Sequence, residues 1–359
     1  MWLSFQPIYP SLHHSSTTVS DVKTTITFLL SAAIGAALCA LGLVASYDFF
    51  TSSNCKVPYD YPQFLLENIR APRIIIDAGS SSMFGIEPAL IEQAFHHPVI
   101  DVADNGSIPL EMKIYRLLKF AKPGDTLILP FEWVYYTRDI VPQDFIDKTP
   151  DKYAAYYESQ PFIERLKFSI LHLSLHNLSD AGRLYLRKDL QRVHYLHMQA
   201  DMAKWPLGDR KDDRRRRSSV EGIDCADYIA ASGTIPSVVE WAAKQLSDLQ
   251  AQQDVRIYVT WPAVAGSDCY LMPDGRLPIA DQARAIFERH GITAVGEPAD
   301  SYFTPEHMLD TYYHVDSAAA RARTQKLVAR LQDAGMRPGE TDHKETIRLA
   351  SEAMRGMPP

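Results

Sequence analysis

The chain has 359 residues, of which 46% are hydrophobic and 23% are charged, a balance typical of folded proteins and not of disordered ones. Its net charge of -7 gives no indication of the basic surface that nucleic-acid binding usually requires, so we expect no nucleic-acid partner. Four cysteines are too few for a disulfide scaffold, and no CxxC or CxxH pair is present, so we expect no metal site.

An uncharged apolar segment, TTITFLLSAAIGAALCALGLV, runs from Thr24 to Val44. A helix of this length crosses a hydrocarbon core of about 30 Å, and the segment lacks the polar stripe of a soluble core helix. We therefore predict a transmembrane anchor over residues 24–46. The alternative is a cleaved signal peptide with its cleavage site in residues 43–46, although the preceding leader of 23 residues is long for that class.

The flanking charges indicate an orientation for this anchor. Lys23 precedes the apolar segment and Asp48 follows it. Positive charge tends to stay on the cytoplasmic side, so the tail of residues 1–23 is predicted to be cytoplasmic and the rest of the chain to be exported.

After a linker and short helix over residues 47–70, strand-like and helix-like segments alternate. Apolar runs of strand length occur at Ile74–Ile76, Val99–Asp104, Asp125–Phe131, Val255–Pro262 and Gly291–Gly296. Runs without polar alternation are typical of strands buried on both faces of a parallel sheet. The helical segments between them imply right-handed crossovers, so residues 71–340 are predicted to form an α/β domain.

The strand pattern stops between about residues 135 and 235, where Tyr, Leu, His and charged residues predict a helical insertion. This region contains the arginine-rich run Asp209–Ser219. Such a run is explained as a solvated loop, or as a site for anionic lipid headgroups or an acidic glycan. Residues 341–359 are predicted to be a C-terminal tail.

Three serines follow the first predicted strand, at Ser80–Ser82. Ligands of open α/β sheets bind at the carboxyl ends of the strands. A serine on a tight strand-to-helix turn is exposed beside backbone N–H groups, which suits a nucleophile whose oxyanion needs donors. Serine is also a preferred helix N-cap, so a purely structural explanation is equally good.

The loop after the second predicted strand contains Asn105 and Gly106. A glycine lets the backbone approach a ligand closely and offers an N–H donor. An ordinary loop glycine is the alternative.

Near the C-terminus, Asp310 and His314 are four residues apart, so on a helix or tight turn they face the same side. A carboxylate beside an imidazole orients it, as a Ser–His–Asp system requires. The alternatives are an exposed loop histidine with a capping Asp, or His307 as the base. On its N-terminal side, His307 has no acidic residue at comparable spacing except Asp300.

In this order, the motifs IDAGSSSMFGI, VADNGSIPL and DTYYHVDSAAARARTQKL resemble the SGNH/GDSL hydrolase superfamily. They resemble in particular a membrane-anchored branch associated with bacterial exopolysaccharide synthesis, which includes proteins that accompany cellulose synthase. The resemblance covers about residues 70–135 and 255–332. It implies a three-layer, flavodoxin-like SGNH fold, held by a single-pass anchor in the inner membrane with the catalytic domain in the periplasm.

The resemblance also implies site roles. Ser80 would be the nucleophile by its spacing to residues 84–86, whereas the usual Gly-x-Ser frame selects Ser81 as the alternative. The backbone N–H groups of Ser80 and Gly106 would be the oxyanion donors, and Asn105 would orient that loop or donate to the oxyanion. His314 would be the general base, with Asp310 as its partner.

Two departures from the family pattern stand out. The family has Asp-x-x-His, and here one more residue intervenes. The third-strand block usually supplies an Asn to the oxyanion hole, but this chain has Glu132 in the sequence PFEW. An ionised carboxylate cannot donate a hydrogen bond and opposes a neighbouring oxyanion unless Glu132 is protonated or points elsewhere. Asn105 could replace the missing donor, and the alternative is that the chain is a non-catalytic descendant.

These observations lead to a leading hypothesis and two alternatives. The first is a cofactor-independent serine esterase or O-acyltransferase that handles acetyl groups on an exported polysaccharide, with a multi-pass membrane acyltransferase or synthase subunit as partner. The second is a non-catalytic assembly factor of an exopolysaccharide synthase, and the third is a lipid-active esterase.

Four aromatic residues near the strand ends are candidates for stacking on sugar rings or for the core, namely Trp133, Tyr135, Tyr136 and Trp261.

Overall fold

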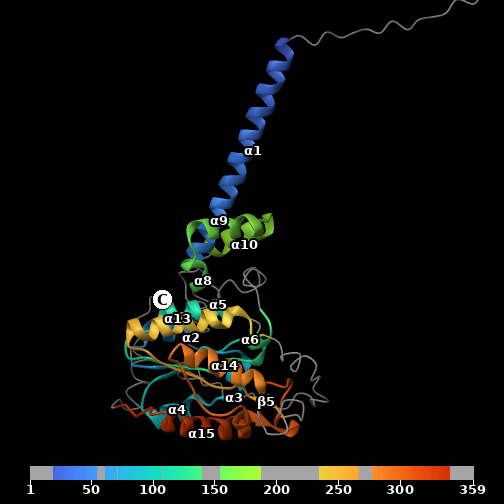
Figure 1. The fold of residues 1–359 in the computed structure, drawn as a ribbon. Coiled ribbons are helices and arrows are strands. Elements are labelled where there is room, and N and C mark those ends of the chain that lie inside the picture. Colours follow the sequence, from blue (N-terminus) through green and yellow to red (C-terminus); the bar gives the residue numbers. More distant parts are fainter. Residues whose placement is uncertain are drawn as a thin grey trace, which may run out of the picture.

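The computed structural model describes residues 19–54, 61–70, 72–106, 108–139, 154–186, 234–266 and 277–339. Within these ranges a long N-terminal helix stands away from an α/β domain (Figure 1). The arginine-rich run at residues 209–219, the tail at 341–359 and most of the tail at 1–23 lie outside the described residues.

The centre of the domain is a five-stranded sheet in the order β2-β1-β3-β4-β6, and every neighbouring pair is parallel. The strands are β1 (Ile74–Ile76), β2 (Val99–Asp101), β3 (Thr126–Leu129), β4 (Arg256–Val259) and β6 (Thr293–Ala294). Each lies within one of the five segments predicted from sequence, so the prediction of a parallel α/β sheet is confirmed.

A smaller parallel sheet pairs β5 (Val264–Ala265) with β7 (Tyr302–Phe303). The sequence analysis missed it because strands of two residues leave no periodicity to detect. The short helices η3 (Pro298–Ser301) and η4 (Pro305–His307) flank β7.

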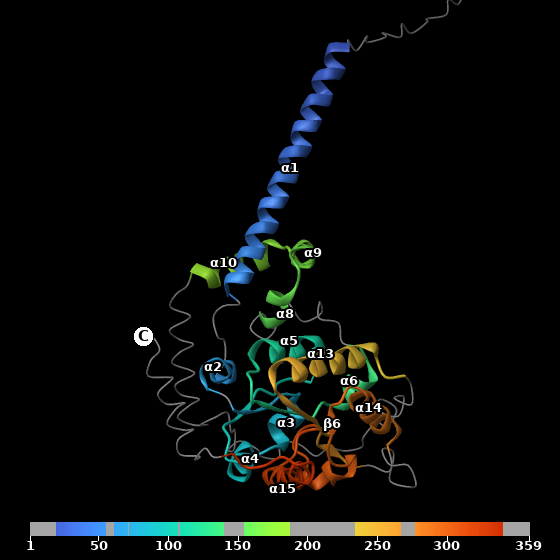
Figure 2. The ribbon, with the colours of Figure 1, turned by 60° about the vertical axis from the view of Figure 1, so that its left-hand side comes forward.

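Helices cover both faces of the main sheet (Figures 1 and 2). One layer consists of α2 (Tyr61–Asn68), α5 (Leu110–Phe120), α13 (Ser237–Gln253) and α14 (Pro278–Arg289). The other consists of α3 (Ser80–Gly85), α4 (Pro88–Phe95) and α15 (Ser317–Asp333). In β1, Ile75 packs into the first layer while Ile74 and Ile76 pack into the second, so the strand carries no polar residue.

The N-terminal helix α1 (Val19–Asn54) is 36 residues long and extends beyond the predicted anchor of residues 24–46. Every side chain from Val22 to Leu43 is exposed, and the segment Val22–Ser53 is long and apolar enough to cross a membrane. Residues 47–54, expected to be linker, continue the helix because Val44, Tyr47 and Thr51 are buried against helices of the insertion.

The described part of the insertion is helical, as predicted. It contains α8 (Ala154–Ser159), α9 (Phe162–His172) and α10 (Leu175–Leu186). These three helices lie between α1 and the α/β domain (Figure 2). The short helix α6 (Trp133–Thr137) follows β3.

Candidate active site

Loops from three strands meet at the carboxyl edge of the sheet. The chain leaves β1 in one direction to form β2 and in the other to reach β3, so the strand order reverses between β1 and β3. Such a switch point is where open α/β sheets bind ligands. The loops are joined there, since the Asp104 N–H donates to the Ala78 carbonyl at 3.2 Å.

The three serines occupy different environments on α3, which begins at Ser80. Ser80 is partly exposed, whereas Ser81 and Ser82 are fully buried. The Ser81 and Ser82 hydroxyls find no hydrogen-bond partner in the described parts of the chain. Of the two predicted nucleophiles, only Ser80 can be reached from solvent in this conformation.

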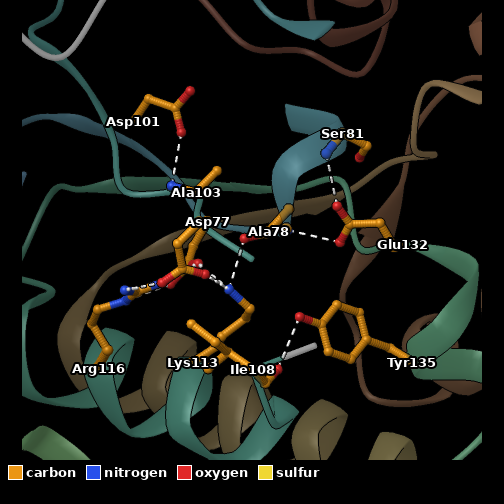
Figure 3. A network of polar contacts seen from close by, with 12 residues as sticks. Asp77, Ala78, Ser81, Asp101, Ala103, Ile108, Lys113, Arg116, Glu132 and Tyr135 are labelled. Carbon is orange, nitrogen blue, oxygen red and sulfur yellow. Dashed lines mark hydrogen bonds and ion pairs between the residues drawn. The ribbon is translucent and has the colours of Figure 1, made fainter. Parts of the chain in front are cut away.

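Glu132, whose carboxylate was expected to oppose an oxyanion, binds the serine turn (Figure 3). Its Oε2 accepts from the Gly79 N–H at 2.7 Å, and its Oε1 accepts from the Ser81 N–H at 2.9 Å. A Cβ on Gly79 would lie 2.2 Å from Glu132 Oε1, so no larger residue fits there. A Cβ on Gly106 would lie 3.3 Å from Glu132 Cδ, which places the carboxyl group between the serine turn and the loop after β2.

The electrostatic setting of Glu132 is mixed. Its side chain is 1% exposed, and this burial raises the pKa of the carboxyl group. The Lys113 ammonium and the two backbone N–H donors act in the opposite direction and lower that pKa. The carboxyl group therefore holds the turn at the cost of losing its own hydration.

The two predicted oxyanion donors are not used by Glu132. Among the described residues, no hydrogen-bond acceptor is bound to the backbone N–H of Ser80 or of Gly106. Asn105 is exposed, and its carbonyl accepts from the Ile108 N–H at 3.0 Å, which closes the turn that contains Gly106. This bond uses the main-chain carbonyl, so both roles predicted for the Asn105 side chain stay predictions.

A buried charge network supports these loops from α5 (Figure 3). Lys113 Nζ donates to the Ala78 carbonyl at 2.7 Å and forms an ion pair with Asp104. Arg116 donates to Asp77 at 2.6 and 3.0 Å and to Asp104 at 2.9 Å. Two bases balance two acids, and the network ties the loops after β1 and β2 to one helix face.

Burial raises the pKa of Asp77, while the neighbouring Arg116 and Lys113 lower it. The sequence analysis missed this network, although it left a signal. Asp77 directly follows β1, and Lys113 and Arg116 are three residues apart on one face of a helix. Which acids these bases meet depends on strand order, which the sequence pattern does not give.

The predicted pair of Asp310 and His314 is formed. His314 Nδ1 lies 2.7 Å from Asp310 Oδ1. The two residues meet across a turn and not along a helix, since Thr311 Oγ1 accepts from the N–H groups of Tyr313 and His314 at 3.3 and 3.2 Å. This turn brings the two side chains together although three residues separate them in sequence.

The turn brings His314 onto the helix that begins with Ser80. The His314 ring stacks on Phe84 with 4.1 Å between ring centroids. Phe84 is four residues after Ser80 in α3 and therefore lies one turn along the same face. No hydrogen bond joins the Ser80 hydroxyl to His314 or to any other described residue in this conformation. Catalytic hydrogen bonds are often formed only when substrate is bound.

The rival His307 has an acidic partner that the sequence analysis did not consider. Its Nδ1 lies 2.9 Å from Asp316 Oδ2, on its C-terminal side. An antiparallel bridge between Met308 and Val315 brings the two together. Asp316 also caps α15 by accepting from the Ala319 N–H at 2.8 Å, so this second pair serves the helix start.

The four aromatic residues near the strand ends belong to the core. Each is 1% exposed, and Trp133 stacks on Trp261 with 5.5 Å between centroids. Core packing, one of the two roles considered for these residues, is therefore found for all four, and none of them presents an exposed ring to a sugar. The Tyr135 hydroxyl donates to the Ile108 carbonyl at 3.0 Å and so steadies the loop that contains Gly106.

The described ranges contain no cluster of three His, Cys, Asp or Glu side chains arranged to hold a metal ion. Comparison of the chain with protein-family models, curated proteins and solved structures finds no match. The function is therefore argued from the geometry of the site.

Proposed function

We propose that the chain is a serine-dependent esterase or O-acyltransferase of the SGNH type that transfers or removes acetyl groups on an exported polysaccharide. The observation that carries the proposal is the Asp310–His314 pair, stacked one helical turn from the accessible Ser80 at the switch point of the sheet. The strand order corresponds to the flavodoxin-like order 2-1-3-4-5 and supports the SGNH-type assignment.

In this proposal His314 acts as the general base. It takes the proton from Ser80 Oγ as the oxygen attacks the ester carbonyl carbon, and Asp310 orients the imidazole and stabilises its charged form. The N–H groups of Ser80 and Gly106 donate to the oxyanion of the tetrahedral intermediate.

His314 then returns the proton to the departing alcohol, which leaves an acyl-Ser80 enzyme. Water or a sugar hydroxyl, deprotonated by His314, attacks that ester and releases Ser80. Water as the acceptor gives hydrolysis, and a sugar hydroxyl gives acyl transfer.

Glu132 acts as a positioning residue. Its carboxylate binds the N–H groups on either side of Ser80, those of Gly79 and Ser81, and so fixes the conformation of the nucleophile turn. Its two oxygens face Gly79 and Ser81, and the Ser80 N–H is left for the oxyanion.

We propose that α1 is an uncleaved anchor in the inner membrane, with the catalytic domain in the periplasm. The helix continues without a break through residues 43–46, the candidate cleavage site, and Val44 is buried by the insertion. Cleavage there would remove part of the packing that holds α9 and α10. An anchored enzyme of this kind would act beside a multi-pass membrane acyltransferase or synthase subunit.

A second candidate is a non-catalytic assembly factor of an exopolysaccharide synthase. Two observations favour it, namely the unformed hydrogen bond between Ser80 and His314 and the carboxylate of Glu132 beside the predicted oxyanion donors. Such a protein would use the same fold to bind glycan or synthase subunits without turnover.

The deciding experiment is p-nitrophenyl acetate hydrolysis and fluorophosphonate labelling by the full chain in detergent, compared with Ser80→Ala and Ser81→Ala. We expect Ser80→Ala to abolish labelling and to lower kcat by roughly 10³-fold or more, while Ser81→Ala retains both. A folded wild-type protein with neither turnover nor labelling would exclude the serine enzyme. Polysaccharide export that survives Ser80→Ala but not deletion of residues 135–235 would support the assembly factor.

A further inference from the structure

Helices α9 and α10 lie across the base of α1 (Figures 1 and 2). Their inner sides pack on the last turns of that helix. The rings of Tyr47 and Phe168 lie 6.4 Å apart, and those of Phe50 and Tyr185 lie 5.3 Å apart. Arg165 also approaches Asp48 at 3.8 Å. The pair is therefore fixed to α1 by both apolar and charged contacts.

Large apolar side chains also point away from this contact. In α9, Ile163 and Ile170 are 54% and 58% exposed, although they are spaced to lie on one face of the helix. In α10, Leu175 and Leu186 are 82% and 75% exposed and again share a face. Phe49 of α1 and Phe162 and Leu171 of α9 are also exposed. So many large apolar side chains left exposed on two neighbouring helices indicate an interaction site.

The position of this surface along α1 identifies what covers it. The exposed apolar stretch from Thr24 to Leu43 is about 30 Å of helix, close to the thickness of a hydrocarbon core. The next residue, Val44, is the first to be buried against the insertion. The two helices therefore contact α1 where its exposed apolar stretch ends, and they run across α1 (Figures 1 and 2).

The charges of α9 and α10 point to apolar burial and not to attraction by anionic headgroups. Two acids, Glu164 and Asp180, stand against three bases, Arg165, Lys167 and Arg183. Interfacial helices without a strong basic face bind by burying apolar area at the boundary between headgroups and acyl chains.

We infer that α9 and α10 form an interfacial collar that lies in the headgroup–acyl boundary of the membrane that α1 spans. This inference rests on the proposed anchoring by α1 and is independent of the proposed chemistry. A single apolar cluster joins the collar to the site loop, since Tyr47, Phe168 and Ala181 pack with Ile108 and Met112. Because Ile108 closes the turn around Gly106, the collar holds the candidate site at a fixed orientation to the bilayer.

The test uses the full chain in nanodiscs of zwitterionic lipid, with the four native cysteines replaced by serine and one nitroxide label per variant. Ile170→Cys and Leu175→Cys report on the collar. Lys326→Cys, on the exposed face of α15, is the aqueous control. One further variant keeps Cys39 and replaces only the other three native cysteines. A label on Cys39, within the exposed stretch of α1, reports on the anchor itself. The measured quantity is the accessibility of each label to molecular oxygen and to a water-soluble nickel chelate.

We expect the labels at 170 and 175 to resemble the label at 39, with high oxygen and low nickel accessibility, while the label at 326 shows the reverse. Replacing part of the lipid with an anionic lipid should leave the labels at 170 and 175 at the same depth. Aqueous labels at 170 and 175 with a lipid-exposed label at 39 would overturn the collar and leave the anchor standing. An aqueous label at 39 would overturn the anchor and the collar together. Dipolar coupling between copies at position 175 without lipid contact would overturn the collar in favour of self-association.

Discussion

The two edges of the main sheet both bury charged side chains, but they treat them differently. At the amino edge, Arg73 pairs with Asp125 at 2.6 Å, and both side chains are fully buried. The guanidinium also donates to carbonyls of Leu66, Ile69 and Phe120. At the carboxyl edge, by contrast, the Ser80 hydroxyl and two backbone N–H groups are left without partners within the described chain.

In the proposed function, the amino edge of the sheet stabilises the fold and the carboxyl edge carries the reactive groups. The amino edge satisfies its charges completely, so it can hold β1, β3 and two connecting segments in place. At the carboxyl edge the charged groups also pair, but they pair beneath the loops, where Lys113 and Arg116 bind Asp77 and Asp104. The groups proposed to act on substrate stay above this network.

The largest effect expected at the carboxyl edge is on turnover and not on stability. Asp310→Asn should lower kcat for p-nitrophenyl acetate by about 10²- to 10⁴-fold, because an amide no longer stabilises the imidazolium of His314. Thermal stability should change little, since the Asp310 side chain is 37% exposed.

Asp316→Asn is the matched control for this change, because asparagine caps a helix as well as aspartate does. It should leave both turnover and stability near those of the wild type. A larger loss of turnover in Asp316→Asn than in Asp310→Asn would mean that His307, and not His314, is the base.

The amino edge should respond in the opposite way. Arg73→Met should lower the free energy of unfolding by about 3–5 kcal/mol, because it leaves Asp125 buried without its partner. Arg330→Met, which removes an exposed pair with Asp300, should cost at most about 1 kcal/mol. Denaturant titration of the full chain in mild detergent, followed by the fluorescence of buried Trp133 and Trp261, measures both. A loss below 1 kcal/mol for Arg73→Met would show that the amino edge is not the stabilising one.

The smallest effect is expected at Glu132, which binds the turn that carries the proposed nucleophile. Glu132→Gln should cost about 1–3 kcal/mol, because the amide NH₂ group faces a backbone N–H and leaves it unsatisfied. Esterase activity should also fall in this variant, because the serine turn is held less firmly. If activity rises instead, the carboxylate is an obstacle to the oxyanion and not a support for the turn.

The pH dependence of this variant provides a second readout. Burial raises the pKa of Glu132 above that of an unfolded glutamate, so at intermediate pH the unfolded chain releases a proton that the folded chain keeps. The free energy of unfolding of the wild type therefore falls as pH rises through this window. The difference in unfolding free energy between the wild type and Glu132→Gln should be largest in acid and should become smaller toward neutral pH. The raised pKa of Asp77 is common to both proteins and cancels in the comparison. Urea titrations at several pH values would contradict this if the difference widened with pH.

Much of the sheet could be predicted from sequence because its strands are buried on both faces. The run Ile74–Ile76 has no polar residue, and each of its side chains meets one helical layer or the other. The pair of Asp310 and His314 was predictable for a similar reason, since four residues of spacing suffice to close a turn. The partner of His307 was missed because Asp316 comes from the other arm of a bridge nine residues away.

The sequence by itself determined the apolar length of the N-terminal helix, the strand segments and the identity of the groups at their carboxyl ends, because these depend on local composition and periodicity. Only the tertiary structure decided which serine is exposed, that Glu132 binds the turn around Ser80, and that α9 and α10 pack at the base of α1. These features depend on strand order and on contacts between segments distant in the chain. No pattern within a single segment carries that information.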